Sequence, residues 1–137
     1  MFKTMLVEDN PSFRLLLKNN LQDQFPSMDI IEAGDGKEAL QKVDSHPPNL
    51  IFMDIKLPGE NGLELTRRIK TDYPHIIIIM LTNYDLPEYR EAAIRNKANH
   101  YLVKSSTSTD EIFKLVKSIL LEKGFNADGS DSKKGDS

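Results

Sequence analysis

Side chains that could act on a phosphoryl group follow the apolar, strand-like runs of this sequence. They are two neighbouring acids, a third carboxylate, a hydroxyl and an ammonium: Glu8, Asp9, Asp54, Thr82 and Lys104. A carboxylate can attack a phosphoryl group and form an acyl phosphate when a metal ion neutralises the developing charge. A lysine and a hydroxyl directed at the transferring oxygens stabilise the transition state further. Together, these residue types predict phosphoryl chemistry.

Asp54 is the predicted centre of this chemistry because a loop of turn-forming residues follows it. It ends the apolar run 49–53, and the loop 55–62 carries Pro58 and Gly62, four and eight residues after the aspartate. A carboxylate in this position is held rigidly at the edge of a sheet, open to a ligand. We interpret Gly62 as a requirement of the backbone, since glycine tolerates conformations and approaches that other residues do not. The alternative is that Asp54 only caps a turn.

Glu8 and Asp9 form an acidic pair whose mutual repulsion is costly unless a cation or a helix N-terminus compensates it. Capping of the following helix is the simpler interpretation of the pair alone. Together with Asp54, however, they supply the hard oxygen ligands that suit Mg²⁺, which keeps several waters and leaves room for a phosphate. We therefore expect a magnesium site at these three acids.

Thr82 and Lys104 are weak signals when each is taken alone. Threonine often ends a strand, and a lysine that follows one is usually solvated. Beside Asp54 they gain specific roles. Lys104 would pair with one phosphoryl oxygen as a point charge, and Thr82 would donate a hydrogen bond to another.

The composition is that of an ordinary globular domain and excludes several classes of function. The 137 residues fit one domain with a single core, with 39% apolar and 28% charged residues. A formal net charge of −3 gives no electrostatic case for direct binding of nucleic acid. The absence of cysteine excludes disulfides and thiol chemistry. No segment approaches the roughly 20 apolar residues that span a bilayer, so we expect no membrane association and a cytoplasmic location.

The elements that must position these residues alternate regularly along the chain. Apolar runs indicate five strands, at 2–7, 28–33, 49–53, 76–81 and 99–103. Helices should begin at capping residues and prolines, at Asn10-Pro11, Asp35, Pro87 and Ser108-Thr109. Strict alternation predicts a parallel sheet with helices on both faces, because each crossover is right-handed. Ligands of such sheets bind at the carboxyl ends of the strands, where the candidate residues stand.

The helices carry apolar stripes, and the chain changes in composition near its end. In the first helix the expected buried stripe is Phe13, Leu16, Leu17 and Leu21. Residues 1–123 are predicted to form the domain. The segment 124–137 is rich in glycine, serine and charge and cannot form a core, so we expect a flexible polar tail or the stump of a linker.

Four motifs at these positions together resemble the receiver domains of two-component response regulators. The motifs are Val7-Glu8-Asp9-Asn10, Met53-Asp54-Ile55-Lys56-Leu57-Pro58-Gly59-Glu60-Asn61-Gly62, Met80-Leu81-Thr82 and Tyr101-Leu102-Val103-Lys104. The resemblance covers residues 2 to about 123 and implies a flavodoxin-like α/β fold, with a five-stranded parallel sheet in the order 2-1-3-4-5. It implies a phosphorylation-switched signalling module, not an enzyme apart from catalysing its own phosphoryl transfer and autodephosphorylation.

The resemblance also implies how the site would bind Mg²⁺ and receive a phosphoryl group. Asp54 would accept a phosphoryl group from a sensor histidine kinase or a histidine phosphotransfer protein. Asp9 would bind Mg²⁺ directly, and Asp54 would belong to the same metal site. Glu8 would bind the ion through water, and Lys56 through its backbone carbonyl.

The switch pair implied by the resemblance is Thr82 and Tyr101. The threonine would move toward the phosphoryl group while the aromatic ring turns inward. The surface formed by the fourth helix, fifth strand and fifth helix would then change, which would alter partner binding or dimerisation.

Two departures from the family pattern bear on the site. Ser105 follows Lys104, where most receivers have a proline in a cis bond. A cis bond before any other residue costs about 3–4 kcal/mol, so we expect a trans Lys104–Ser105 bond. Asn83 replaces the small residue usual after the threonine and could narrow access to the phosphoryl group.

Within the family, the sequence is most similar to receivers that precede LuxR-type helix-turn-helix domains, which points to transcription regulation. The winged-helix class usually has an acidic residue before the switch tyrosine, where this chain has His100. A stand-alone receiver and a part of a longer regulator both fit the sequence. Two other functions stay open: a phosphohydrolase of the haloacid dehalogenase type, and an interaction module that is never phosphorylated. The first uses a second aspartate at the position that Lys56 occupies here.

Overall fold

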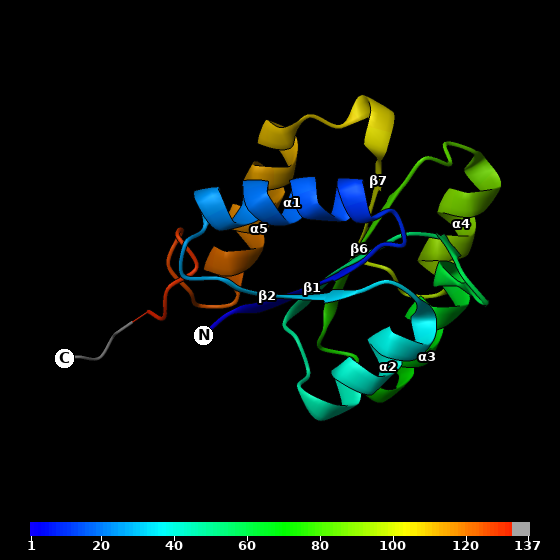
Figure 1. Ribbon diagram of the computed structural model, residues 1–137, viewed down its shortest axis with the longest axis horizontal. Helices are drawn as coiled ribbons and strands as arrows, with labels where there is room; N and C mark the ends of the chain where they lie inside the picture. Colours follow the sequence, from blue (N-terminus) through cyan, green and yellow to red (C-terminus); the bar gives the residue numbers. More distant parts are fainter. Residues whose placement is uncertain (133–137) are drawn as a thin grey trace.

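The computed structural model describes residues 1–132 and shows a five-stranded parallel sheet between two layers of helices (Figure 1). The strands are β1 (Lys3–Val7), β2 (Asp29–Ala33), β3 (Leu50–Met53), β6 (Ile77–Thr82) and β7 (His100–Val103). They lie in the order β2-β1-β3-β6-β7, and every neighbouring pair is parallel. Among these strands the order is therefore 2-1-3-4-5, which confirms the predicted flavodoxin-like α/β fold.

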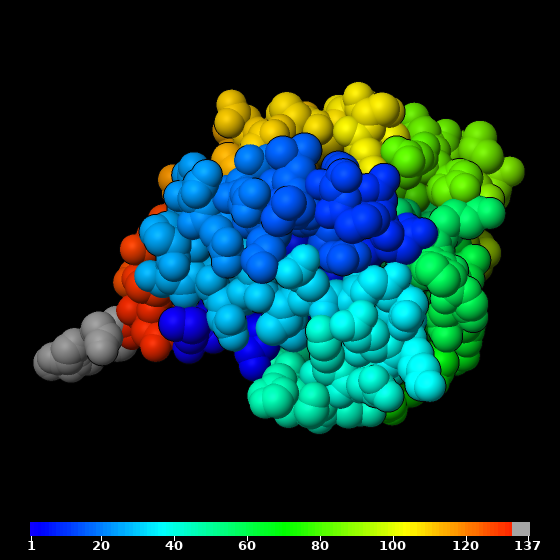
Figure 2. All heavy atoms as spheres, viewed as in Figure 1, coloured from blue at the N-terminus to red at the C-terminus, as the bar shows by residue number. Residues whose placement is uncertain are grey.

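Helices cover both faces of the sheet. They are α1 (Pro11–Gln24), α2 (Gly36–Ser45), α3 (Gly62–Asp72), α4 (Pro87–Arg95) and α5 (Thr109–Glu122). α1 and α5 lie on one face, and α2, α3 and α4 pack on the other (Figure 1). Figure 2 shows α1, in blue, at the surface beside the segment that leads into α5. Each layer of helices encloses its own apolar core.

The central strands are apolar throughout because both of their faces are covered. In β3, Ile51 and Met53 belong to the core beneath α2 and α3, whereas Leu50 and Phe52 belong to the core beneath α1 and α5. All four side chains are buried. Since successive residues of a strand point to opposite faces, a strand between two helical layers needs apolar residues at every position. Continuous apolar runs therefore predicted the strands correctly.

Capping residues fix where the helices begin. Asn10, Asp35 and Ser108 accept hydrogen bonds from backbone N–H groups in the first turns of α1, α2 and α5. Pro11 and Pro87 are the first residues of α1 and α4. These contacts satisfy N–H groups that have no partner inside a helix. The predicted helix starts are confirmed.

Two details differ from the sequence expectations. Leu16, expected in the buried stripe of α1, is 57% exposed. The buried stripe centres on Leu17 and Leu21, and because consecutive residues are rotated by about 100° around the helix axis, Leu16 points away from the core. In addition, β4 (Lys56–Leu57) and β5 (Glu60–Asn61) form an antiparallel hairpin in the loop after β3. Strands of this length carry no periodicity that a sequence pattern can reveal.

The segment after α5 returns to the start of the chain. The ring of Phe125 packs edge-on against Phe2, with 5.1 Å between the ring centroids. Phe125 also forms an isolated antiparallel bridge with Asp131, and the amino group of Met1 lies 3.1 Å from Asp131 Oδ1. The domain boundary after Lys123 stays a prediction, and the end of the expected tail, 133–137, lies outside the described residues. Within 1–132, none of the helices has the length and apolar character that a membrane span requires.

Candidate functional site

The candidate residues meet at the carboxyl edge of the sheet. Glu8 and Asp54 directly follow β1 and β3, Thr82 ends β6, and Lys104 follows β7. The backbone N–H of Asp54 donates a hydrogen bond to the carbonyl of Val7 at 3.1 Å, which extends the pairing of β1 with β3 to the site itself. This edge lies where the chain leaves neighbouring strands toward opposite faces, the position at which such sheets bind ligands.

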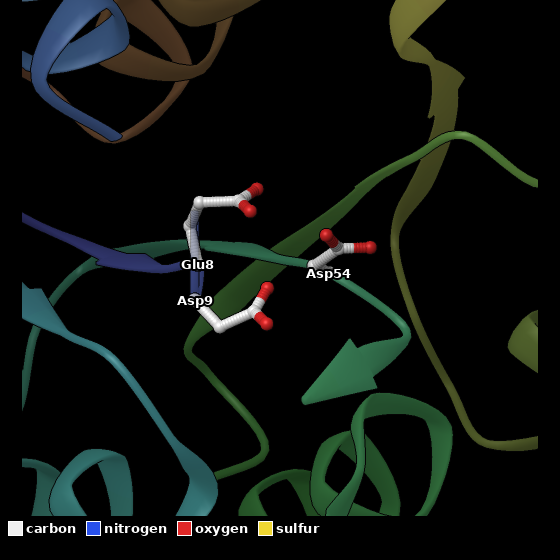
Figure 3. Close-up of side chains that lie close together, drawn as sticks. All are labelled: Glu8, Asp9 and Asp54. Atoms are coloured by element: carbon white, nitrogen blue, oxygen red, sulfur yellow. The ribbon is translucent and has the colours of Figure 1, made fainter. Parts of the chain in front are cut away.

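Three carboxylates gather on one side of this edge. Glu8, Asp9 and Asp54 each offer an oxygen, and these oxygens lie within 4.8 Å of one another. Figure 3 shows Glu8 and Asp9 at the end of β1, with the carboxylate of Asp54 beside them. Glu8 and Asp54 are buried and Asp9 is exposed. Clustered carboxylates of this kind fit a hard cation such as Mg²⁺, because oxygen ligands suit it and an exposed side leaves room for water.

Lys104 supplies the positive charge within this cluster. Its Nζ donates to Glu8 Oε1 at 2.8 Å and to Asp54 Oδ2 at 3.1 Å. Burial by itself would lower the pKa of Lys104, but the hydrogen bond to Glu8 and the charge of Asp54 outweigh it and raise this pKa. The ammonium group is thus held in its charged form beside the carboxylate of Asp54.

For the pKa of Glu8, in contrast, burial outweighs the hydrogen bonds. Burial raises the pKa of its carboxyl group, and hydrogen bonds from Lys104 and from the backbone N–H of Asn10 offset only part of that rise. The Asn10 N–H donates to Glu8 Oε2 at 3.1 Å. Both oxygens of Glu8 therefore already have donors, whereas Asp9 stands open to solvent.

The loop after β3 holds Asp54 in place through its backbone. Asp54 Oδ1 accepts a hydrogen bond from the N–H of Ile55 at 2.7 Å. Gly62 approaches from the start of α3, and its N–H donates to the carbonyl of Ile55 at 2.7 Å. A Cβ at Gly62 would lie 1.8 Å from the backbone oxygen of Asp54, far inside van der Waals contact. The interpretation of Gly62 as a backbone requirement is confirmed.

Thr82 and Tyr101 lie on neighbouring strands and share a partner. Thr82 is buried, and its hydroxyl oxygen accepts a weak hydrogen bond from the Tyr84 N–H at 3.4 Å. The hydroxyl of Tyr101 donates to the backbone carbonyl of Tyr84 at 2.6 Å. Burial raises the pKa of Tyr101, although the guanidinium of Arg90 over its ring acts against this. The segment after β6 thus links the Thr82 hydroxyl at the end of β6 to the ring on β7.

Two further residues bear on the sequence expectations. The Lys104–Ser105 bond is trans, since the residues from 1 to 132 contain no cis peptide, and it begins a 3₁₀ turn, Lys104–Ser106. The expectation of a trans bond is confirmed. Lys56 is exposed in β4, and Asn83, directly after β6, is exposed as well.

Sequence reasoning missed the cationic and aromatic side chains that α1 brings to the site. Arg14 donates from Nη1 to the backbone carbonyl of Glu8 and from Nε to Glu32 Oε1. Phe13 places its ring against Lys104. In the sequence, Phe13 and Arg14 are marked only by their position one turn after the N-cap of α1. Spacing alone does not show which residues a long side chain will contact.

Comparison with known proteins places the chain among signalling proteins. Residues 4–117 match the family model described as response regulator receiver domain. Among curated relatives, the oxygen regulatory protein NreC of Staphylococcus carnosus is 41% identical over 88 residues, which cover 64% of this chain and 40% of NreC. The chain spans about half the length, or less, of the curated relatives it matches.

Solved structures agree in fold. The response regulator protein TrrA of Thermotoga maritima, in complex with Mg²⁺ and BeF, is 37% identical, with a TM-score of 0.77 over 88% of this chain and 100% of TrrA. A two-component response regulator of the LuxR family from Aurantimonas is 28% identical, with a TM-score of 0.78 over 88% of this chain and 85% of that one. The second match supports the predicted similarity to receivers of LuxR-type regulators.

Proposed function

Since this chain belongs to the response regulator receiver family, we propose that Asp54 is the residue through which a two-component system phosphorylates it. Receiver domains are signalling domains rather than classical enzymes. The observation that carries the proposal is the meeting of three carboxylates and Lys104 at one edge of the sheet. Asp54 is the member of this cluster that both follows the central strand β3 and contacts the ammonium.

The surroundings of Asp54 suit a nucleophile in phosphoryl transfer. Its Oδ1 is held by the Ile55 N–H, so the carboxylate has a fixed orientation. Lys104 donates to Oδ2 and stands ready to pair with an oxygen of the incoming group. The buried hydroxyl of Thr82 ends the neighbouring strand and would donate to another such oxygen. The same groups would serve the chain's own phosphoryl transfer and autodephosphorylation.

Mg²⁺ is the proposed cofactor of this step. Asp9, which is exposed, and Asp54 would bind it directly, Lys56 would bind it through its backbone carbonyl, and Glu8 would act through water. The bound ion would neutralise charge that develops on the phosphoryl oxygens. The solved TrrA structure, which holds Mg²⁺ and BeF, supports this assignment by similarity.

The proposed output is a change of the surface around α4, β7 and α5. Thr82 and Tyr101 both contact the backbone of Tyr84, which leads into α4. A movement of Thr82 toward a phosphoryl group would disturb its contact with the Tyr84 N–H and so the segment that receives the Tyr101 hydroxyl. Partner binding or dimerisation through this surface would then depend on phosphorylation.

The proposed partner is a sensor histidine kinase or a histidine phosphotransfer protein, acting in the cytoplasm. By similarity to NreC and to the LuxR-family regulator of Aurantimonas, we propose that the signal serves transcription regulation. Direct contact with DNA would belong to another domain or protein, since this chain carries a formal net charge of −3.

Binding of beryllofluoride, a mimic of the phosphoryl group, tests the proposal. The protein should bind it only in the presence of Mg²⁺, and Asp54→Asn and Asp54→Ala should abolish binding as followed by calorimetry or NMR. Asp23→Asn, a change of an exposed acid on α1, is the matched control and should leave binding intact. Unchanged binding in the Asp54 variants would refute the proposal and favour an interaction module that is never phosphorylated.

A further inference from the structure

The ring of Phe13 lies against the ammonium group of Lys104. Lys104 Nζ is 4.3 Å from the ring centroid, well within the distance of about 6 Å at which an aromatic face attracts a cation. Phe13 is in the first turn of α1, whereas Lys104 follows β7. The contact therefore joins two segments that are far apart in the sequence.

We propose that Phe13 is a positioning residue that holds the Lys104 ammonium beside Asp54. The inference rests on the proposed function, because Lys104 matters only if Asp54 receives a phosphoryl group. It adds a residue to the site that belongs to none of the sequence motifs of that function.

The backbone position of Lys104 does not by itself determine where its ammonium group lies. The trans bond from Lys104 to Ser105 enters a short 3₁₀ turn, and a flexible four-carbon stem carries the ammonium. Its ion pairs are with Glu8 and Asp54, the carboxylates that Mg²⁺ and a phosphoryl group would engage. The contact with Phe13 uses no group of the metal site, so it can persist when the site is loaded.

The ring also limits the water around the ammonium. The Lys104 side chain is only 12% exposed, and Phe13 and Lys104 share the wall of a cavity of about 180 Å³ between α1 and α5. An ammonium with less water around it attracts a phosphoryl oxygen more strongly. Loss of the ring should therefore weaken the hold of Lys104 on such an oxygen.

The competing explanation is that Phe13 only packs between α1 and α5, and Phe113 provides the control for it. Phe113 lies on α5, lines the same cavity and is half-buried like Phe13. Its ring packs edge-on against Phe25, with 5.8 Å between the centroids. Phe113→Leu removes the same atoms from the same cavity as Phe13→Leu, but it removes no ring from Lys104.

The first experiment needs neither metal nor phosphoryl mimic. In the free protein, the Hε protons of Lys104, assigned by comparison with Lys104→Arg, should show an upfield ring-current shift in a ¹H–¹³C NMR spectrum. The shift should disappear in Phe13→Leu, persist in Phe13→Tyr and persist in Phe113→Leu. A spectrum of Lys104 that is unchanged by Phe13→Leu would overturn the inference while leaving the proposed function untouched.

The second experiment measures the affinity for beryllofluoride in saturating Mg²⁺. Phe13→Leu should weaken it by roughly three- to tenfold, Phe13→Tyr should restore it, and Phe113→Leu should match the unaltered protein. In a Lys104→Met background, Phe13→Leu should have no further effect, because the two residues then no longer interact. Two results would reduce the role of Phe13 to packing. The first is an equal loss of affinity in Phe13→Leu and Phe113→Leu, and the second is that Phe13→Leu weakens binding just as much in the Lys104→Met background. Failure of the unaltered protein to bind the mimic would instead count against the proposed function.

Discussion

At the scale of single residues, the backbone of Gly62 governs the position of Asp54. The start of α3 passes so close to the Asp54 carbonyl that no side chain fits between them. The sequence predicted both residues, because a strand-ending acid and a glycine eight residues later are visible as spacing. Phe13 and Arg14 were missed, since their contacts depend on where long side chains reach.

We expect Gly62→Ala to impair both folding and the site. The new Cβ would meet the Asp54 backbone at 1.8 Å, and relief of this clash should cost about 2–4 kcal/mol of the free energy of unfolding. Urea denaturation measures this loss, and binding of beryllofluoride should weaken in the variant that remains folded.

Gly34→Ala is the matched control for this change, because its Cβ would come no closer than 3.5 Å to its neighbours, an ordinary van der Waals contact with the end of the Arg14 side chain. Its cost should stay below about 1 kcal/mol. Comparable losses at Gly62 and Gly34 would contradict the assigned role of Gly62.

At the scale of elements, salt bridges from α1 to the end of β2 brace the loop that carries the acidic pair. Glu32 accepts from Arg14 Nε at 3.1 Å and from Lys18 Nζ at 3.0 Å. Arg14 also donates to the carbonyl of Glu8. Strands and helix starts were predictable, because apolar runs and caps are local signals, but a brace between α1 and β2 depends on packing that no local pattern encodes.

The brace should make stability depend on pH through Glu32. Burial opposes ionisation, but the hydrogen bonds from Lys18 and Arg14 outweigh it and lower the pKa of Glu32 below its usual value of 4.5. A depressed pKa means that the stabilisation is complete above the unfolded-state pKa and is lost as the pH falls through the folded-state pKa. Glu32→Gln should therefore lower the free energy of unfolding at pH 7 by about 1 kcal/mol.

The difference between the unaltered protein and Glu32→Gln should shrink as the pH falls below 4.5. Chemical denaturation at a series of pH values measures this difference in the free energy of unfolding. Glu91→Gln, at an exposed position on α4, should follow the unaltered protein throughout. A constant difference across the pH series would show that Glu32 acts by packing rather than by charge.

At the scale of the whole molecule, the described part of the segment after α5 belongs to the packed structure. Phe125 contacts Phe2, and Gly129 is buried against Met28 with a φ of 90° that favours glycine. Composition alone suggested a flexible tail from residue 124, because glycine, serine and charge dominate there. One aromatic residue, Phe125, attaches this segment to Phe2, and the average composition of a segment does not reveal the effect of one residue.

Phe125→Ala should lower stability without touching the site. Loss of the ring contact should cost about 1–2 kcal/mol and lower the melting temperature by roughly 3–8 °C in calorimetry. The affinity for beryllofluoride should not change, since the segment lies at the opposite end of the sheet. Leu121→Ala, at a 55% exposed position on α5, should change stability by less than about 0.5 kcal/mol. Equal melting temperatures for Phe125→Ala and the unaltered protein would exclude the segment from the folded unit.

The pairing of Met1 with Asp131 makes the described chain almost a closed ring. A short peptide linker from residue 132 back to Met1 would add little loop-closure entropy, so new ends could be opened in a surface loop elsewhere. Such a circular permutant would carry reporter groups at a chosen edge of the molecule. A fluorescent protein joined between β6 and α4, for example, would lie beside Tyr84, and its fluorescence would then report binding of a phosphoryl group at the site.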